Sequence, residues 1–208
     1  ELQNVIIIWA KELLKTVNIY NRTLCYKSRE NLPGLFNPYT IKLTINEHGP
    51  SRVKKLIKSF VVNHKACKMA LKIIKYVNFS ESDVIVDIGS NDGTFLSFFE
   101  NLGLKRVGID PTISKFANSY HSDIIKVPEF FTKDSFNSVS DKSAKFISSI
   151  SMMYDLDDPV NFALQVHSCL DDNGFWFFEQ SYLGLMLEKL AYDTVCHEHL
   201  EYYSAYTI

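Results

Sequence analysis

The spacing of hydrophobic residues changes once along this chain, near residue 77. Between Ser51 and Tyr76 apolar side chains recur at helical spacing, which predicts a leading helix over 51–76. Beyond that point, short runs of β-branched and aromatic residues alternate with amphipathic stretches. The short runs predict five strands, at residues 84–88, 106–109, 123–127, 145–149 and 175–178.

Helices are predicted between these strands, at residues 94–102, 111–120 and 159–170. Two of them begin with an Asp-Pro pair, Asp110-Pro111 and Asp158-Pro159. Aspartate suits the N-cap of a helix, and proline suits its first position. A turn over 171–174 is predicted to separate the last of these helices from the last strand.

Strands that alternate with helices are joined by right-handed crossovers, which produce a mainly parallel sheet. We therefore predict an α/β, Rossmann-like fold, with a twisted, mainly parallel sheet and helices on both faces. Residues 51–208 are predicted to form this domain, with its core at 84–179. Ligands bind beyond the carboxyl ends of such strands, so 180–208 is predicted to face the acceptor. Residues 1–50 are predicted to form a partly helical N-terminal segment.

Composition excludes several classes of protein. The chain has 208 residues, is 46% hydrophobic and carries a formal net charge of -2, so bulk charge favours neither a nucleic acid nor a membrane surface as partner. The apolar run at 5–10 is too short to span a membrane. The four cysteines are widely spread and form no C-x-x-C pair, which argues against a zinc ribbon and favours a cytoplasmic location.

A glycine-rich turn follows the first predicted strand and reads Asp87-Ile88-Gly89-Ser90-Asn91-Asp92-Gly93. A dinucleotide-binding turn spaces three glycines to admit a pyrophosphate. Here asparagine takes the middle position, and the last glycine comes one residue early. A methionine-derived ligand fits better, because its amino group suits the carboxylate of Asp87 and its own carboxylate suits the backbone N–H groups of the turn.

A second acidic residue, Asp110, ends the second predicted strand. A carboxylate about 20 residues after the turn is the usual partner of ribose hydroxyls. The same side chain is predicted to cap the next helix. Both roles are compatible, because capping uses one carboxylate oxygen.

The stretch from Val84 to Gly93 resembles motif I of the class I S-adenosylmethionine-dependent methyltransferases, and Gly108-Ile109-Asp110-Pro111 resembles their second motif. The resemblance implies S-adenosyl-L-methionine as the cofactor, and a sheet with about five of that fold's seven strands. It implies a cofactor site formed by Asp87, Gly89, Ser90, Asn91, Gly93, Asp110, Pro111 and Ser151.

A narrower resemblance covers residues 79–208 and is carried by Tyr192 to Ser204, which contains His197-Glu198-His199. This stretch resembles the C-methyltransferases that act on nucleotide-linked deoxy sugars. In that family a base removes the proton beside a sugar carbonyl, and the resulting enolate takes the methyl group. The resemblance implies small-molecule acceptors such as a nucleotide-linked keto-sugar. It implies His199 as the base, Glu198 as its support, His197 as an alternative base, and Tyr154 and Tyr182 as hydrogen-bonding partners of the substrate.

A metal site is not predicted at His197 and His199. Histidines two positions apart point to opposite sides of a helix, whereas the zinc signature on helices places them four apart. A strand would place both on one face, but no third ligand is evident in the sequence.

Two other functions stay open at the level of sequence. The acceptor atom could be an oxygen or nitrogen of another small molecule, deprotonated by His199. Alternatively, the chain could bind S-adenosylmethionine without catalysis. We expect a chain truncated at both ends relative to the sugar C-methyltransferases, because only Cys25 stands where they carry paired cysteines. Cys196 also replaces a tyrosine of that family.

Overall fold

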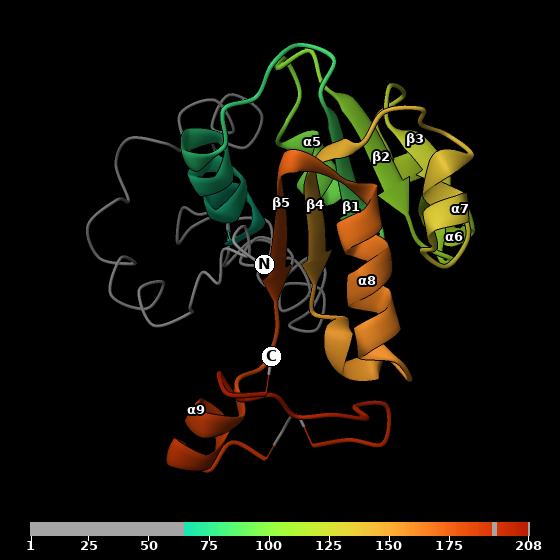
Figure 1. The fold of residues 1–208 in the computed structure, drawn as a ribbon. Coiled ribbons are helices and arrows are strands. Elements are labelled where there is room, and N and C mark those ends of the chain that lie inside the picture. Colours follow the sequence, from blue (N-terminus) through green and yellow to red (C-terminus); the bar gives the residue numbers. More distant parts are fainter. Residues whose placement is uncertain (1–64, 193–194, 208) are drawn as a thin grey trace, which may run out of the picture. The chain divides into compact units, whose positions relative to one another are not determined.

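The computed structural model describes residues 65–192 and 195–207. Within these ranges five parallel strands form one sheet, in the order β3-β2-β1-β4-β5 (Figure 1). The strands are β1 (Val84–Ile88), β2 (Lys105–Ile109), β3 (Ile125–Val127), β4 (Ala144–Ile150) and β5 (Leu170–Glu179). The predicted Rossmann-like sheet is confirmed, and every pairing in it is parallel. The predictions for residues 1–64 lie outside the described residues.

The described helices are a segment over 65–76, α5 (Thr94–Ser97), α6 (Ile113–Phe116), α7 (Lys133–Asn137), α8 (Pro159–Cys169) and α9 (Leu183–Glu188). Asp158 caps α8 as predicted, and its side chain accepts a hydrogen bond from the Asn161 N–H at 3.0 Å. The prediction missed α7, which begins with a capping box between Thr132 and Ser135. That signal is short, and it lies in a stretch without a long apolar period.

Helix α5 ends earlier than the sequence predicts. It stops at Ser97 rather than at 102, and the next three residues make turns with bonds to the third residue before them. The carbonyl of Leu96 accepts a hydrogen bond of 2.9 Å from the guanidinium of Arg106 on β2. In a longer helix the same carbonyl would accept the N–H of Glu100. The carbonyl instead accepts the Phe99 N–H at 3.2 Å together with the Arg106 guanidinium, so a tertiary contact accompanies the early end of the helix.

The predicted turn at 171–174 lies inside β5 as a bulge. Ala144 of β4 pairs with Leu170, but Phe146 pairs with Phe175, so β5 carries extra residues between these two positions. The Asp171 side chain closes the bulge by accepting the N–H of Asn173 at 3.0 Å. The turn chemistry is as the sequence predicts, but the strand continues through it.

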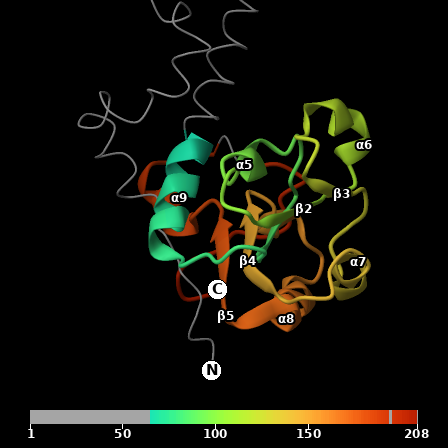
Figure 2. The same ribbon diagram turned by 90° about the horizontal axis from the view of Figure 1, so that it is seen from above.

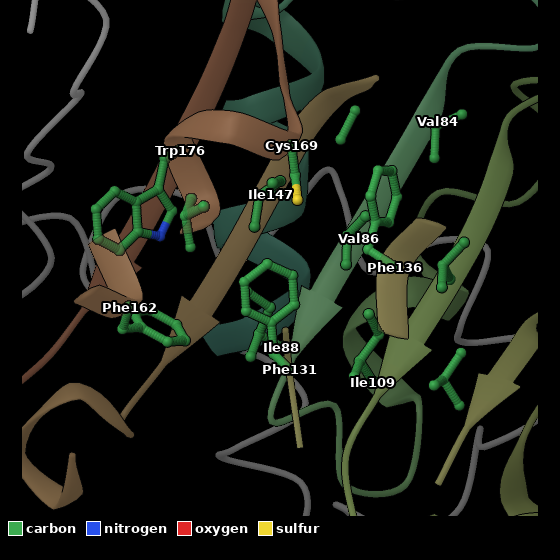
Figure 3. Packing of buried hydrophobic residues seen from close by; sticks show 14 of the residues in the cluster. Val84, Val86, Ile88, Ile109, Phe131, Phe136, Ile147, Phe162, Cys169 and Trp176 are labelled. Atoms are coloured by element: carbon green, nitrogen blue, oxygen red, sulfur yellow. The ribbon is translucent and has the colours of Figure 1, made fainter. Parts of the chain in front are cut away.

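The sheet is buried on both faces. Alternate residues of β1 point to opposite sides, and Val86 and Ile88 pack with Phe136 of α7 and Phe162 of α8 (Figure 3). Aromatic rings pack against the other face, where the ring centroids of Phe99 and Phe146 lie 6.1 Å apart. Figure 2 shows α7 and α8 on one side of the sheet and α5 on the other. Helices on both faces are thus confirmed.

The direction of the connections changes once in the sheet, between β1 and β4. From β1 the chain proceeds through β2 and β3 in one direction, and then returns to place β4 on the other side of β1. The connections leave β1 and β4 in opposite directions, and sheets of this kind bind their ligands beyond the carboxyl ends of the strands at such a position. Figure 1 shows the segment with α9 beyond the edge to which the strand arrows point.

In the described ranges, no helix has the length and apolar character that a membrane crossing needs.

The ion pair between Arg106 and Asp123 is asymmetric, since the Arg106 side chain is 2% exposed and that of Asp123 is 58% exposed. Asp123→Asn is expected to destabilise the fold by about 3 kcal/mol, because the buried guanidinium loses its counter-charge. Arg106→Met is expected to cost about 1 kcal/mol, because the carboxylate left behind is solvated. Urea unfolding of both variants measures the difference. Equal losses, or a larger loss for Arg106→Met, would contradict this interpretation.

Candidate cofactor and acceptor site

The glycine-rich turn after β1 adopts backbone angles that its residues explain. Gly89 and Gly93 have φ of 72° and 75°, in the left-handed region that glycine tolerates without strain. A Cβ at Gly93 would also lie 2.8 Å from the ring of Tyr120. Asn91 shares the left-handed region with φ 48°, where asparagine is the best tolerated alternative to glycine. The turn is therefore tight, and the Tyr120 ring packs directly against it.

Asp110, at the end of β2, connects this turn to the next loop. Its Oδ2 accepts the N–H of Asn91 at 2.8 Å, and its Oδ1 accepts both the N–H and the hydroxyl of Thr112 at 2.6 Å. The side chain is buried, at 7% exposure. Oδ2 keeps a lone pair for one further donor, such as a ribose hydroxyl.

One prediction for Asp110 is wrong. Helix α6 begins at Ile113 and its N-cap is Thr112, so Asp110 is not the cap and Pro111 is not the first helical residue. The carboxylate instead binds Thr112 two residues ahead, which closes a local turn before the helix can start. Pro111 lies exposed within that turn.

Asp87 lies near the carboxyl end of β1, beside Ser148 of β4. Its carboxyl group is buried and accepts a hydrogen bond of 2.7 Å from the Ser148 hydroxyl on β4. Burial raises the pKa of Asp87 to about 7, and the charges of Asp110 and Asp92 add to this effect. The described residues place no basic side chain against it. A cationic ligand would supply the missing charge.

The loops after β4 and β5 are connected by Ser151. Its hydroxyl donates to Glu179 Oε2 at 2.7 Å, and its N–H donates to the Glu179 carbonyl at the same distance. Ser151 has φ 54°. The Met152 side chain that follows lies 3.6 Å from the position of a Cβ at Gly89. Ser151 and Gly89, both predicted for the cofactor site, therefore lie at one edge of the sheet.

The structure brings two of the predicted acceptor-side residues together. The rings of Tyr154 and His199 lie with their centroids 4.1 Å apart, and the Tyr154 carbonyl accepts the N–H of Leu200 at 2.8 Å. Burial raises the pKa of the Tyr154 hydroxyl. Burial also raises the pKa of Asp155, which the nearby His199 opposes. His199 is thus held by the loop after β4, close to an acidic side chain.

The other predicted acceptor-side residues lie differently. Glu198 lies 3.4 Å from His197, between Oε1 and Nε2, and both side chains are largely exposed. His199 lowers the pKa of a different acidic side chain, that of Asp155. Tyr182 stands at the start of α9, where the Leu183 N–H donates to the Tyr203 carbonyl at 2.8 Å.

Sequence reasoning missed four residues that shape this site, namely Tyr120, Ser148, Asp155 and Glu179. Ser148 and Glu179 lie near the ends of predicted strands, where parallel sheets gather their ligands, so strand position could have indicated them. Asp155 follows Tyr154 directly. Tyr120 carries no such signal, because its contacts depend on how the chain returns after β2.

Comparison with known proteins agrees with this geometry. The profile of a family described as "Methyltransferase domain" matches residues 62–208. The chain therefore belongs to the methyltransferase-domain family, and its sheet has the Rossmann-like fold of the class I methyltransferase domains.

Individual relatives are distant. The C-methyltransferase NovU of Streptomyces niveus is 25% identical over 133 residues, which are 63% of this chain and 32% of NovU, so the match spans about a third of that relative. A Haloferax volcanii protein described as a methyltransferase, solved with its Trm112 activator, has a TM-score of 0.52 and 19% identity, covering 67% of this chain and 62% of that one. A Bacillus halodurans protein so described has a TM-score of 0.50 and 9% identity, covering 66% and 63%. These two likenesses show the fold.

The residues of the site fit S-adenosylmethionine, which carries an ammonium and a sulfonium charge. The buried carboxyl group of Asp87 has Ser148 as a hydrogen-bond donor but no basic partner among the described residues, so it suits the ammonium group. The remaining lone pair of Asp110 suits a ribose hydroxyl. The described residues hold no group of three or more His, Cys, Asp or Glu side chains that could bind a metal ion.

Cofactor affinity is expected to depend on pH through Asp87. Since its pKa is raised to about 7, the carboxyl group is ionised at pH 8 and becomes protonated below pH 7. If the ammonium group of the cofactor needs the ionised form, the Kd rises about tenfold per pH unit below 7. Calorimetry with S-adenosylmethionine between pH 5.5 and 8 measures this. Asp87→Asn should bind weakly at pH 8 and show little pH dependence. A wild-type Kd that stays constant from pH 8 to pH 6 would refute the role of Asp87.

Proposed function

We propose that this protein methylates a carbon atom beside the carbonyl group of a small-molecule acceptor, with His199 as the base. The observation that carries the proposal is the contact between His199 and Tyr154, which lies in the loop after β4. This contact holds an imidazole at the sheet edge where Asp87, Asp110 and Ser151 lie. The similarity to a protein described as a C-methyltransferase supports the choice of carbon as the acceptor atom.

Histidine suits the proton transfer that this reaction needs, because it changes charge near neutral pH. S-adenosylmethionine supplies an electrophilic methyl group and leaves as S-adenosylhomocysteine. His199 accepts the proton of the acceptor C–H bond, and the electron pair of that bond passes toward the carbonyl oxygen as an enolate. The carbon then gains the methyl group in place of the proton, and His199 returns the proton to water.

The loop after β4 gives His199 a defined position. The Tyr154 carbonyl accepts the N–H groups of Leu200 and Glu201, at 2.8 and 3.3 Å, so the chain directly after His199 is anchored. We propose that Asp155, whose pKa the nearby His199 lowers against the effect of burial, stabilises the positive charge that His199 acquires. We infer that Asp155 takes the supporting role that the sequence assigns to Glu198, because Glu198 pairs with His197 instead.

A nucleotide-linked keto-sugar is the acceptor that we propose, because the His197-Glu198-His199 segment resembles that of the sugar C-methyltransferases. Tyr154 and Tyr182 are proposed to hydrogen-bond its hydroxyl groups. Tyrosine suits this task, because the phenol group can both donate and accept.

Deuterium exchange tests the proposed reaction. A thymidine-diphosphate-linked 4-keto-6-deoxy sugar is incubated with the protein in deuterated water, and NMR follows the protons beside the carbonyl. We expect one of these protons to exchange much faster than in buffer, even without S-adenosylmethionine, because His199 removes it before the methyl group moves. Methyl transfer to any acceptor without prior exchange at a carbon would instead indicate O- or N-methylation and would overturn the proposal.

The identity of the base is tested by two histidine variants. His199→Ala is expected to lower turnover and proton exchange about 1,000-fold, because it removes the group that accepts the proton. His197→Ala is the matched control and should change both rates little, since its side chain is 91% exposed. Calorimetry with S-adenosylmethionine should give the same Kd for both variants as for wild type. A large loss in His197→Ala with normal turnover in His199→Ala would reverse the assignment.

A further inference from the structure

The Tyr120 side chain packs against the glycine-rich turn, in the space left by the missing side chains of Gly93 and Gly108. It follows the 3-10 helix at Ala117–Ser119 and is 7% exposed. A Cβ at Gly93 would lie 2.8 Å from its ring, and a Cβ at Gly108 of β2 would lie 3.0 Å from the ring. The turn and the second strand therefore approach each other across this tyrosine.

The hydroxyl of Tyr120 makes two hydrogen bonds, both with the turn. It donates to the Asn91 carbonyl at 3.0 Å and lies 2.7 Å from the Ser90 hydroxyl. A phenol group has one hydrogen, and that hydrogen goes to Asn91, so Ser90 is the donor in the second bond. Burial raises the pKa of Tyr120 to about 12, which keeps the hydroxyl protonated at neutral pH.

These bonds restrict the backbone conformation of Asn91. Its φ of 48° lies in the left-handed region, which costs a residue other than glycine about 1 kcal/mol. Its N–H is held by Asp110 at 2.8 Å, and its carbonyl is held by Tyr120. Both backbone groups of Asn91 are therefore used. The bond from its N–H orients the Ser90-Asn91 peptide plane, and the bond to its carbonyl orients the Asn91-Asp92 peptide plane.

We propose that Tyr120 is a positioning residue of the cofactor site, which acts through the Ser90-Asn91 segment to shape the turn that receives S-adenosylmethionine. The hydroxyl, more than the ring, carries this role. The Ser90 side chain is 5% exposed and is committed to Tyr120, so it affects the cofactor through Tyr120 and the backbone. Without the hydroxyl, Asn91 is free to leave the left-handed region, and the turn loses its binding conformation.

The opposing interpretation is that Tyr120 only supports the core. In that case the ring is the important part, and its replacement changes stability but leaves cofactor affinity intact. Tyr120→Phe separates the two, because it keeps the ring and removes only the hydroxyl. Tyr206→Phe is the matched control, since Tyr206 is 97% exposed.

Calorimetry with S-adenosylmethionine tests the proposal at a temperature where circular dichroism shows every variant to be folded. We expect Tyr120→Phe to raise the Kd about tenfold, which corresponds to the loss of one well-placed hydrogen bond. Ser90→Ala should raise it about threefold. The double variant should be no weaker than Tyr120→Phe alone, because Ser90 acts through the same hydroxyl.

Three results would overturn the proposal. The first is a wild-type Kd in Tyr120→Phe with only a lowered unfolding midpoint, and the second is a wild-type chain that does not bind S-adenosylmethionine. If Tyr120→Phe does not fold, the proposal is tested with Ser90→Ala instead. The third result is then a wild-type Kd in Ser90→Ala. The measurement needs no acceptor, so its outcome is independent of the reaction assigned to His199.

Discussion

The backbone of a single residue, Asn91, couples the two loops on which the cofactor site depends. Its N–H reaches the carboxylate of Asp110 at the end of β2, and its carbonyl accepts from Tyr120. Neither bond forms unless the turn after β1 bends sharply at Gly89 and Gly93. The cost of the left-handed conformation at Asn91 is thus offset by two hydrogen bonds, and the turn becomes a rigid part of the sheet edge.

Acidic side chains gather at this edge, and among the described residues none of the ion pairs joins a basic side chain to Asp87. Burial raises the pKa of Asp87, the charges of Asp110 and Asp92 add to this effect, and the Ser148 hydroxyl opposes it only in part. Such an arrangement is unfavourable for an isolated fold but suitable for a cofactor whose ammonium and sulfonium charges outweigh its single carboxylate. The ligand then restores the balance that the folded chain lacks.

The proposed acceptor side is built around the loop after β4. Ser151 connects this loop to Glu179 on β5, and Tyr154 anchors the chain after His199 through its carbonyl and its ring. Residues separated by about 45 positions in sequence therefore lie together at the carboxyl edge, as parallel sheets arrange their ligands. The loop joins the cofactor half of the site to the proposed base.

The sequence by itself determined the α/β class, the five strands and the acidic residues at the ends of β1 and β2, because strand burial and turn chemistry depend on local residue types. It also determined the Asp158 cap of α8, whose partner lies three residues away. Tertiary structure decided the rest. Arg106 takes the Leu96 carbonyl and ends α5 early, Asp110 binds Thr112 and Asn91 and does not cap α6, and Tyr120 reaches the turn from 29 positions away. These contacts depend on distances between strands, and a linear pattern of residues does not contain such distances.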